Sequence, residues 1–390
     1  MKYKYQLILL GSDVKEKQNI LNQINIELKN LNLPNEFVKI IDAASIEVEY
    51  KGNQPAFALY FGDVNGDFKD LDITQRLLKD GTMILPIHFN GFSSDIPKIL
   101  SNQNAIPYKK TEINRITNIV LEAFELLRST RKVFISYRRT ESTSIAIQLY
   151  EALEANNFDV FLDTHSMQKG EPFQEELWHR MTDCDVIVLL NTPGFLESHW
   201  CKEEFAEAGA KQIGIVQLVW PNHLIKDIDI SSHISYPIQL TETDFIENVY
   251  DNTGKLLSDF IEKIVQEVES VRARNLAARQ DNLITEFRNI AEKNGRIVTV
   301  QPEKILTEDR PNGEHIIYIP TIGIPQSTSC QSAEIKKELL GYDEVSIRLI
   351  YDDLRIRDKW LKHLEWLNDN LKKDIKTLKK QDFELWLQTK

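Results

Sequence analysis

The stretch V-F-I-S-Y-R-R, residues 133–139, decides the fold of the middle of the chain. Its apolar run from Val133 to Ser136 predicts a short buried strand that ends in polar residues. Further apolar runs alternate with helical patterns after it. The expected strands are 159–162, 185–190, 214–219 and 236–240, and the expected helices are 144–155, 171–182 and 202–211. This alternation predicts the α/β class, with a doubly wound parallel sheet.

The same alternation precedes this stretch and predicts an N-terminal α/β domain over residues 1–128. Its expected strands are 6–10, 37–41, 56–61 and 82–88, followed by a helix that places Ile113, Ile116, Val120, Phe124 and Leu127 on one face. Both regions end in a long amphipathic helix. This shared order suggests a distant internal duplication with a period of about 130 residues.

On the other side, a long helix from Leu256 to Val271 ends the central domain, predicted at 131–271. Residues 271–280 are charged and Ala-rich without Pro or Gly, which predicts a helical connection. A smaller C-terminal α/β unit is expected at 280–390. Its expected strands are 296–300, 315–319 and 345–351, before a helical tail that carries Trp360, Trp366 and Trp386.

Composition narrows the function. The 390 residues carry 47 Lys plus Arg against 59 Asp plus Glu, a net charge of −12, which argues against nucleic acid or an anionic membrane as partner. Three cysteines, Cys184, Cys201 and Cys330, form no C-x-x-C pair and predict no metal site. No apolar run approaches the length of a membrane span. We expect a protein of the reducing cytoplasm, without a nucleotide-phosphate loop.

Three further stretches complete a specific pattern: F-D-V-F-L-D-T-H-S-M-Q-K-G-E at 158–171, D-V-I-V-L-L at 185–190, and S-H-W-C-K-E-E-F-A-E-A at 198–208. With the first strand, they make residues 131–271 resemble a TIR domain, whose fold is flavodoxin-like. The matching positions are Phe134, Ser136, Tyr137, Asp163, Met167, Gly170, Ser198, Trp200, Cys201 and Glu204. In a doubly wound sheet, ligands bind beyond the carboxyl ends of the strands, where several of these residues are expected.

Many TIR domains consume NAD, and the resemblance implies that Glu204 of S-x-W-C-x-x-E is the catalytic residue. NAD would be the substrate, with no further cofactor and no metal. The nicotinamide leaving group is already a cation, so no general acid is needed, and one carboxylate can stabilise the oxocarbenium-like transition state. Trp200 lies four residues before Glu204 and shares its helix face. The products would be nicotinamide and ADP-ribose, linear or cyclised.

The resemblance also implies the residues that bind NAD and a loop that gates the site. The NAD-binding residues would be Ser136, Tyr137, Arg138, Asp163, Ser198 and Trp200, with the arginine available for the pyrophosphate. The loop that follows Asp163 would gate the site and mediate self-association through Met167, Lys169 and Gly170.

Simpler interpretations stand beside these roles. Glu204 could be one solvated carboxylate among Glu197, Glu203 and Glu207, and Ser198 a helix N-cap. Cys201 is expected in the core, and Arg138 could belong to a solvated turn. His165, His179 and His199 lack a metal-like grouping and are expected at the surface.

The flanking domains would regulate the central one. The N-terminal domain has no counterpart of W-C-x-x-E and, if TIR-like, would be inactive. We expect an NAD glycohydrolase that assembly switches on, in an immune or anti-phage effector whose flanks sense an unidentified trigger. The alternatives are a non-enzymatic scaffold that recruits other TIR domains, or an enzyme that makes a nucleotide second messenger.

Overall fold

The chain folds into two compact units, Met1–Ser129 and Thr130–Lys390, in a computed structural model. The structure describes residues 5–31, 33–52, 54–109, 112–124, 126–127, 130–162, 179–195, 209, 211–223, 235–301, 304–340, 345–370 and 374–388.

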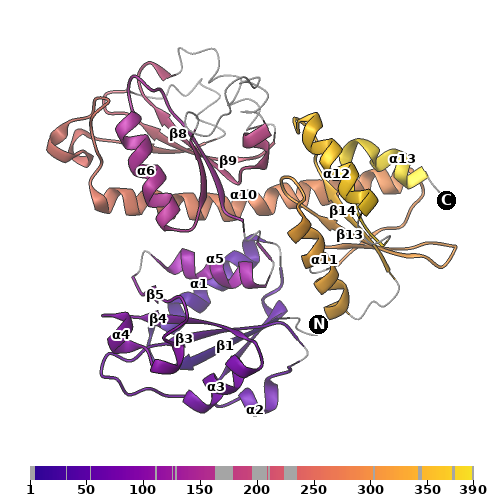
Figure 1. Ribbon diagram of the computed structural model, residues 1–390, viewed down its shortest axis with the longest axis horizontal. Helices are drawn as coiled ribbons and strands as arrows, with labels where there is room; N and C mark the ends of the chain where they lie inside the picture. Colours follow the sequence, from indigo (N-terminus) through magenta and orange to yellow (C-terminus); the bar gives the residue numbers. More distant parts are fainter. Residues whose placement is uncertain are drawn as a thin grey trace. The chain divides into compact units, whose positions relative to one another are not determined.

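The N-terminal unit is a parallel five-stranded sheet in the order β2-β1-β3-β4-β5 (Figure 1). Its elements are β1 Tyr5–Gly11, α1 Glu16–Asn30, β2 Val38–Asp42, α2 Ile46–Glu49, β3 Ala56–Phe61, α3 Leu71–Lys79, β4 Met83–His88, α4 Phe92–Asp95, β5 Ile106–Pro107 and α5 Ile113–Ala123. The four strands predicted there are all present, each within one residue of its expected bounds. Strand β5 was missed because two residues, one of them proline, carry no periodic signal.

The central sheet repeats that topology, with the strand order β10-β9-β8-β6-β7 and all pairs parallel. Its elements are β6 Lys132–Ser136, α6 Thr143–Ala155, β7 Asp159–Leu162, β8 Val186–Asn191, β9 Gly214–Val219 and β10 Tyr236–Gln239. Both sheets thus follow the flavodoxin-like order, in which the first strand lies between the second and the third. The predicted doubly wound parallel sheet is confirmed.

The C-terminal sheet has the order β11-β12-β13-β14-β15, antiparallel up to β13 and parallel beyond it. Its elements are β11 Thr299–Val300, β12 Leu306–Asp309, β13 His315–Pro320, α11 Ser327–Leu340, β14 Val345–Tyr351, α12 Asp358–Asn370, β15 Ile375–Lys379 and α13 Phe383–Gln388.

The tail after β14 was predicted as helical throughout, and that detail is wrong, because strand β15 separates α12 from α13. The surrounding lysines hid a short strand in which Ile375, Thr377 and Leu378 are buried. The polar strand β12 was not predicted, and β11 is shorter than the expected 296–300.

Helix α10, Ser258–Lys293, packs against both sheets of the second unit (Figure 1). Its first half packs Ile261, Ile264 and Val268 against the central sheet. Its second half packs Leu283 and Phe287 against the C-terminal sheet. The helix is unbroken through residues 271–280, which confirms the predicted helical connection. At about 1.5 Å per residue its 36 residues span about 54 Å.

Among the helices that the structure describes, none has the length and apolarity to cross a membrane.

Candidate active site

The strand order of the central sheet reverses between β6 and β8. The chain leaves β6, adds β7 on one side, and then adds β8 on the other side. In open α/β sheets, ligands bind outside the carboxyl ends of the strands at such a point. Ser136 at the end of β6 pairs with Leu189, so β8 continues two residues further, to Asn191. The candidate site is therefore built from the ends of these two strands.

Three predicted binding residues lie together at the end of β6. Ser136 is buried, and Tyr137 is buried in the core that α6 and α10 form on one face of the sheet. Arg138 is half-exposed, and its Nη1 donates to Glu141 Oε1 at 2.6 Å. Of the three side chains, the guanidinium of Arg138 is the most exposed to solvent.

Gly194 brings the loop after β8 against Arg138. A Cβ at this glycine would lie 1.5 Å from Arg138 Nη1 and 2.4 Å from Glu141 Oε1. Its backbone N–H donates to Glu141 Oε2 at 3.2 Å. Only a residue without a side chain lets the arginine lie across this loop, so Gly194 joins the two halves of the site.

Asn191 and Thr192, at the end of β8, are candidate site residues that sequence reasoning missed. Both are fully buried. Within the described part of the chain, neither the amide atoms of Asn191 nor Oγ1 of Thr192 has a hydrogen-bond partner. A buried polar group without a partner costs about 1–3 kcal/mol, so these groups are suited to a ligand that supplies the missing bonds. A signal existed, because the polar pair Asn-Thr ends an otherwise apolar strand at the ligand-binding edge.

The other seven predicted site residues lie outside the described residues. These are Asp163, Met167, Lys169, Gly170, Ser198, Trp200 and Glu204. The described residues next to these segments are informative. Met181, Phe195 and Ile213 pack in one buried core with Ile187 and Leu189 of β8. The described residues that flank these segments therefore pack on one face of the central sheet.

A family model described as a TIR domain matches residues 133–248. Residues 133–248 therefore form a TIR domain. The matched range contains β6 to β10 and the switch point between β6 and β8.

A curated relative is a Brachypodium distachyon protein named "Probable 2' cyclic ADP-D-ribose synthase", 30% identical over 79 residues. The match covers 20% of this chain and 35% of the relative, so the chain spans about a third of that relative's length. The crystal structure of protein VC1899 from Vibrio cholerae is 8% identical, with a TM-score of 0.20 over 98% of this chain and 96% of that one. At that TM-score the likeness carries no argument about the fold.

The opposite edge of the TIR sheet holds buried ion pairs with a structural role. Arg272 of α10 and Asp185 before β8 are both fully buried, with Nε and Oδ2 3.0 Å apart. Arg131 and Glu269 form a second buried pair beside it. These pairs lie at the amino ends of the strands, so they attach α10 to the TIR sheet and are remote from the candidate site.

The C-terminal sheet contacts the TIR domain at one of the segments already described. His179 was expected at the surface, and that prediction is wrong. Its side chain is buried and its ring stacks on Trp360 of α12, with centroids 5.4 Å apart. Asp183 lies two residues after Met181 in the same helix, and its Oδ1 accepts the N–H of Ile324 at 2.9 Å. The covering helix α12 explains why a histidine there is not exposed.

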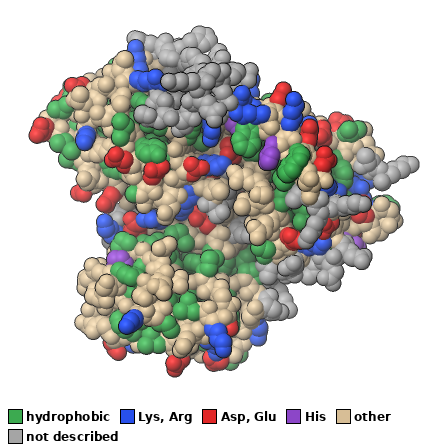
Figure 2. Space-filling model, viewed as in Figure 1, with side chains coloured by type: hydrophobic (Ala, Val, Ile, Leu, Met, Phe, Trp, Pro, Cys, Tyr) green, Lys and Arg blue, Asp and Glu red, His purple; other side chains and the backbone are tan. Residues whose placement is uncertain are grey.

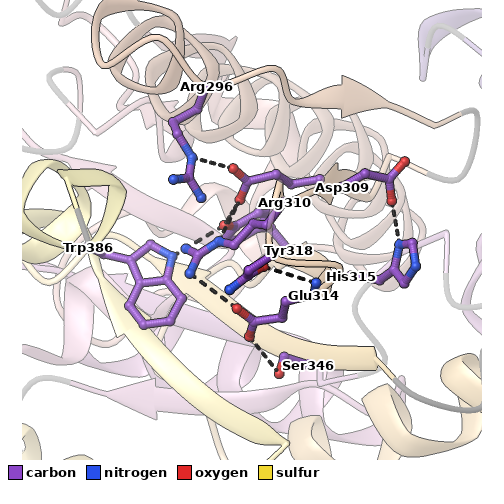
Figure 3. Close-up of polar contacts among 10 residues, drawn as sticks. Arg296, Asp309, Arg310, Glu314, His315, Tyr318, Ser346 and Trp386 are labelled. Atoms are coloured by element: carbon purple, nitrogen blue, oxygen red, sulfur yellow. Dashed lines mark hydrogen bonds and ion pairs between the residues drawn. The ribbon is translucent and has the colours of Figure 1, made fainter. Parts of the chain in front are cut away.

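A second polar cluster lies within the C-terminal sheet, and Figure 3 shows its contacts. Glu308 accepts from Arg296 Nε at 2.5 Å and from the Tyr318 hydroxyl at 2.6 Å. Burial and the Glu308 contact raise the pKa of Tyr318 above its usual range. The guanidinium of Arg310 lies over the ring of Trp386. Because arginines neutralise its carboxylates, this cluster ties β12, β13 and α13 together.

In the described ranges, no group of three or more His, Cys, Asp or Glu side chains is arranged to hold a metal ion. On the face drawn in Figure 2, basic and acidic side chains are interspersed.

Proposed function

We propose that the TIR domain cleaves the bond between nicotinamide and ribose in NAD, with Glu204 as the catalytic carboxylate. The observation that carries the proposal is the S-x-W-C-x-x-E motif, residues 198–204, inside a matched TIR domain. The likeness to a relative named as a cyclic ADP-D-ribose synthase supports it. The products would be nicotinamide and ADP-ribose or a cyclic isomer.

The chemistry suits what the chain offers. The departing nicotinamide needs no proton, so the protein must orient the ribose and stabilise positive charge that develops on it. A carboxylate at Glu204 would supply the negative charge that stabilises it. Arg138 would contact the pyrophosphate, and the buried amide of Asn191 would bind a hydroxyl or carboxamide of the substrate. Gly194 would keep the arginine in the place where the structure has it.

We further propose that self-association through the TIR domain activates cleavage and that the flanking domains respond to a trigger. An enzyme that consumes NAD without restraint would harm its own cell, which favours control by assembly. The cytoplasmic setting and the role in immunity or phage defence belong to this proposal.

The test is chromatography of NAD incubated with the full chain at low and high protein concentration. We expect nicotinamide release whose rate per protomer rises with protein concentration. Glu204→Gln should reduce it by about a hundredfold or more, the usual result of removing one electrostatic contact to the transition state. Glu203→Gln is the matched control, because it removes the neighbouring carboxylate.

A Glu204→Gln variant with the wild-type rate would refute the catalytic assignment. If NAD stays intact at every protein concentration, the scaffold function is favoured instead. The retention times of the products decide between linear and cyclic ADP-ribose.

A further inference from the structure

A cavity lies at the carboxyl edge of the C-terminal sheet. Strands β13, β14 and β15 are parallel, so their carboxyl ends meet at one edge. Thr321 follows β13, Asp352 follows β14, and Lys380 follows β15, and all three line the cavity. This is the edge at which α/β sheets bind ligands.

The opposite wall of the cavity comes from the TIR domain and α10. Thr182 and Lys211 of the TIR domain line it, together with Arg279 of α10. Arg279 donates to the carbonyl oxygens of Cys184 at 2.8 Å and Thr182 at 3.1 Å. These bonds fix the guanidinium at the wall. The cavity thus spans two sheets whose relative position is set by α10 and by the contact of Asp183 with Ile324.

The lining carries charges of both signs in unequal number. Lys211, Arg279 and Lys380 are basic, whereas Glu286 and Asp352 are acidic. Lys380 Nζ lies 2.6 Å from Glu286 Oε2. Burial alone would lower the pKa of Lys380, but the nearby carboxylates of Glu286 and Asp352 have the larger effect. The pKa of Lys380 is therefore raised, and this lysine stays charged. Basic groups bind phosphate oxygens, and carboxylates beside them accept hydrogen bonds from ribose hydroxyls.

The size of the cavity limits the ligand. Its volume is about 90 Å³. A cavity needs about 10–15 Å³ of such volume to hold one water, so this cavity has room for about six to nine waters. The same number of waters occupies about 180–270 Å³ in the liquid. A pentose monophosphate fits in that space.

We propose that this cavity binds a phosphate monoester of a pentose, its phosphate on Lys380 and Arg279 and its hydroxyls on Asp352. Such a ligand would contact the TIR domain at Thr182 and Lys211 and would join the two sheets. Thr182 closely follows the undescribed segment 163–178, and Lys211 closely follows the segment 196–208 that contains Glu204. The site does not depend on NAD cleavage, because its chemistry rests on the cavity alone.

Calorimetric titration of the full chain with ribose 5-phosphate tests the proposal, with inorganic phosphate and unmodified ribose as comparison ligands. We expect saturable binding of ribose 5-phosphate at one site per chain, weaker binding of phosphate, and none of ribose. Lys380→Gln should weaken binding of ribose 5-phosphate by about tenfold or more. Lys379→Gln is the matched control, since this neighbouring lysine does not line the cavity, and it should bind as the wild type does.

A second variant separates the sugar from the phosphate. Asp352→Asn keeps an oxygen to accept the N–H of Leu354 but loses the charge. This variant should bind ribose 5-phosphate more weakly than the wild type, and its affinity for inorganic phosphate should be unchanged. Titration with adenosine 5'-monophosphate identifies the source, because tighter binding than ribose 5-phosphate assigns the site to a nucleotide and weaker binding to a free sugar phosphate.

Three results would overturn the proposal. One is the absence of binding heat with both ribose 5-phosphate and the nucleotide at about 5 mM ligand. The second is unchanged affinity in Lys380→Gln with a wild-type circular dichroism spectrum. The third is equal affinity for inorganic phosphate and ribose 5-phosphate, which would leave an anion site without recognition of the sugar. Glu286 is half-exposed, so the loss of Lys380 leaves no buried charge and the variant should fold.

Discussion

Asn191 is the side chain whose environment most clearly lacks an explanation in terms of stability alone. Its amide is fully buried and, among the described residues, has no partner. Hydrophobic side chains occupy the rest of β8, and leucine has the same number and branching of side-chain heavy atoms as asparagine. The amide is therefore retained at a cost to folding, which is common at functional sites.

Replacing Asn191 with leucine should separate stability from activity. We expect Asn191→Leu to leave the free energy of unfolding unchanged or to raise it by about 1–3 kcal/mol, because an unsatisfied polar group is removed. The kcat/KM for NAD should fall by about tenfold or more, as one substrate contact is lost. Urea denaturation and a nicotinamide-release assay measure the two effects.

The control is Gln217→Leu, which changes another buried polar side chain one strand away, on β9. It should keep the wild-type kcat/KM. If Asn191→Leu instead lowers stability and leaves activity unchanged, the amide has a structural role.

Cys330 is buried in the C-terminal core, and burial raises its thiol pKa to about 11. Because only the thiolate reacts, and it appears as the pH approaches that value, the native chain should resist alkylation at Cys330 at neutral pH. Peptide mass mapping after iodoacetamide treatment measures this, with the urea-unfolded chain as the reactive control. Rapid alkylation of Cys330 in the folded protein at pH 7 would contradict the burial.

Helix α10 depends on a buried arginine for its attachment to the TIR sheet. Arg272→Met should lower the free energy of unfolding by about 3–5 kcal/mol, because it leaves the fully buried Asp185 without its cation. Arg288→Met is the matched control on the same helix. The pair of Arg288 with Glu292 is about half exposed, so its loss should change stability by at most about 0.5 kcal/mol. Equal effects of the two substitutions in urea denaturation would contradict this account.

The elements that could be predicted are those whose sequence pattern matches their environment. Strands β6 and β8 are buried on both faces, so they appear as continuous apolar runs, and their bounds were predicted to within one residue. Strands β12 and β15 each carry two charged side chains, so they resemble loop or helix in the sequence. Contacts between sheets leave no local pattern, which is why the burial of His179 under Trp360 was not foreseen.

Some residues of the candidate site could likewise be predicted from the sequence, and others could not. Ser136, Tyr137 and Arg138 were predicted because they belong to a motif, and the structure places them at the switch point. Asn191, Thr192 and Gly194 belong to no motif. They are identified only by what surrounds them: a missing hydrogen bond in two cases, and a guanidinium in the space of a side chain in the third.

At the scale of the whole molecule, the TIR domain extends beyond its own strands and loops, because residues of α10 contribute to its stability. A fragment of residues 131–271 contains Asp185 but not Arg272, and it lacks Arg279, which binds the carbonyls of Thr182 and Cys184. We expect this fragment to unfold at a clearly lower urea concentration than a fragment of residues 131–280, which contains both arginines. Equal midpoints for the two fragments would show that these arginines contribute nothing to the TIR core.

The shared helix also restricts how the chain can change in length. In α10, the residues that belong to the core of the TIR sheet end at Val271, and those that belong to the core of the C-terminal sheet begin at Leu283. One inserted residue between them would turn everything downstream by about 100° and advance it by about 1.5 Å. Phe287 would then leave its core. One-residue insertions and deletions in this segment should therefore disrupt one of the two cores, and a constant spacing there should identify chains that share this architecture.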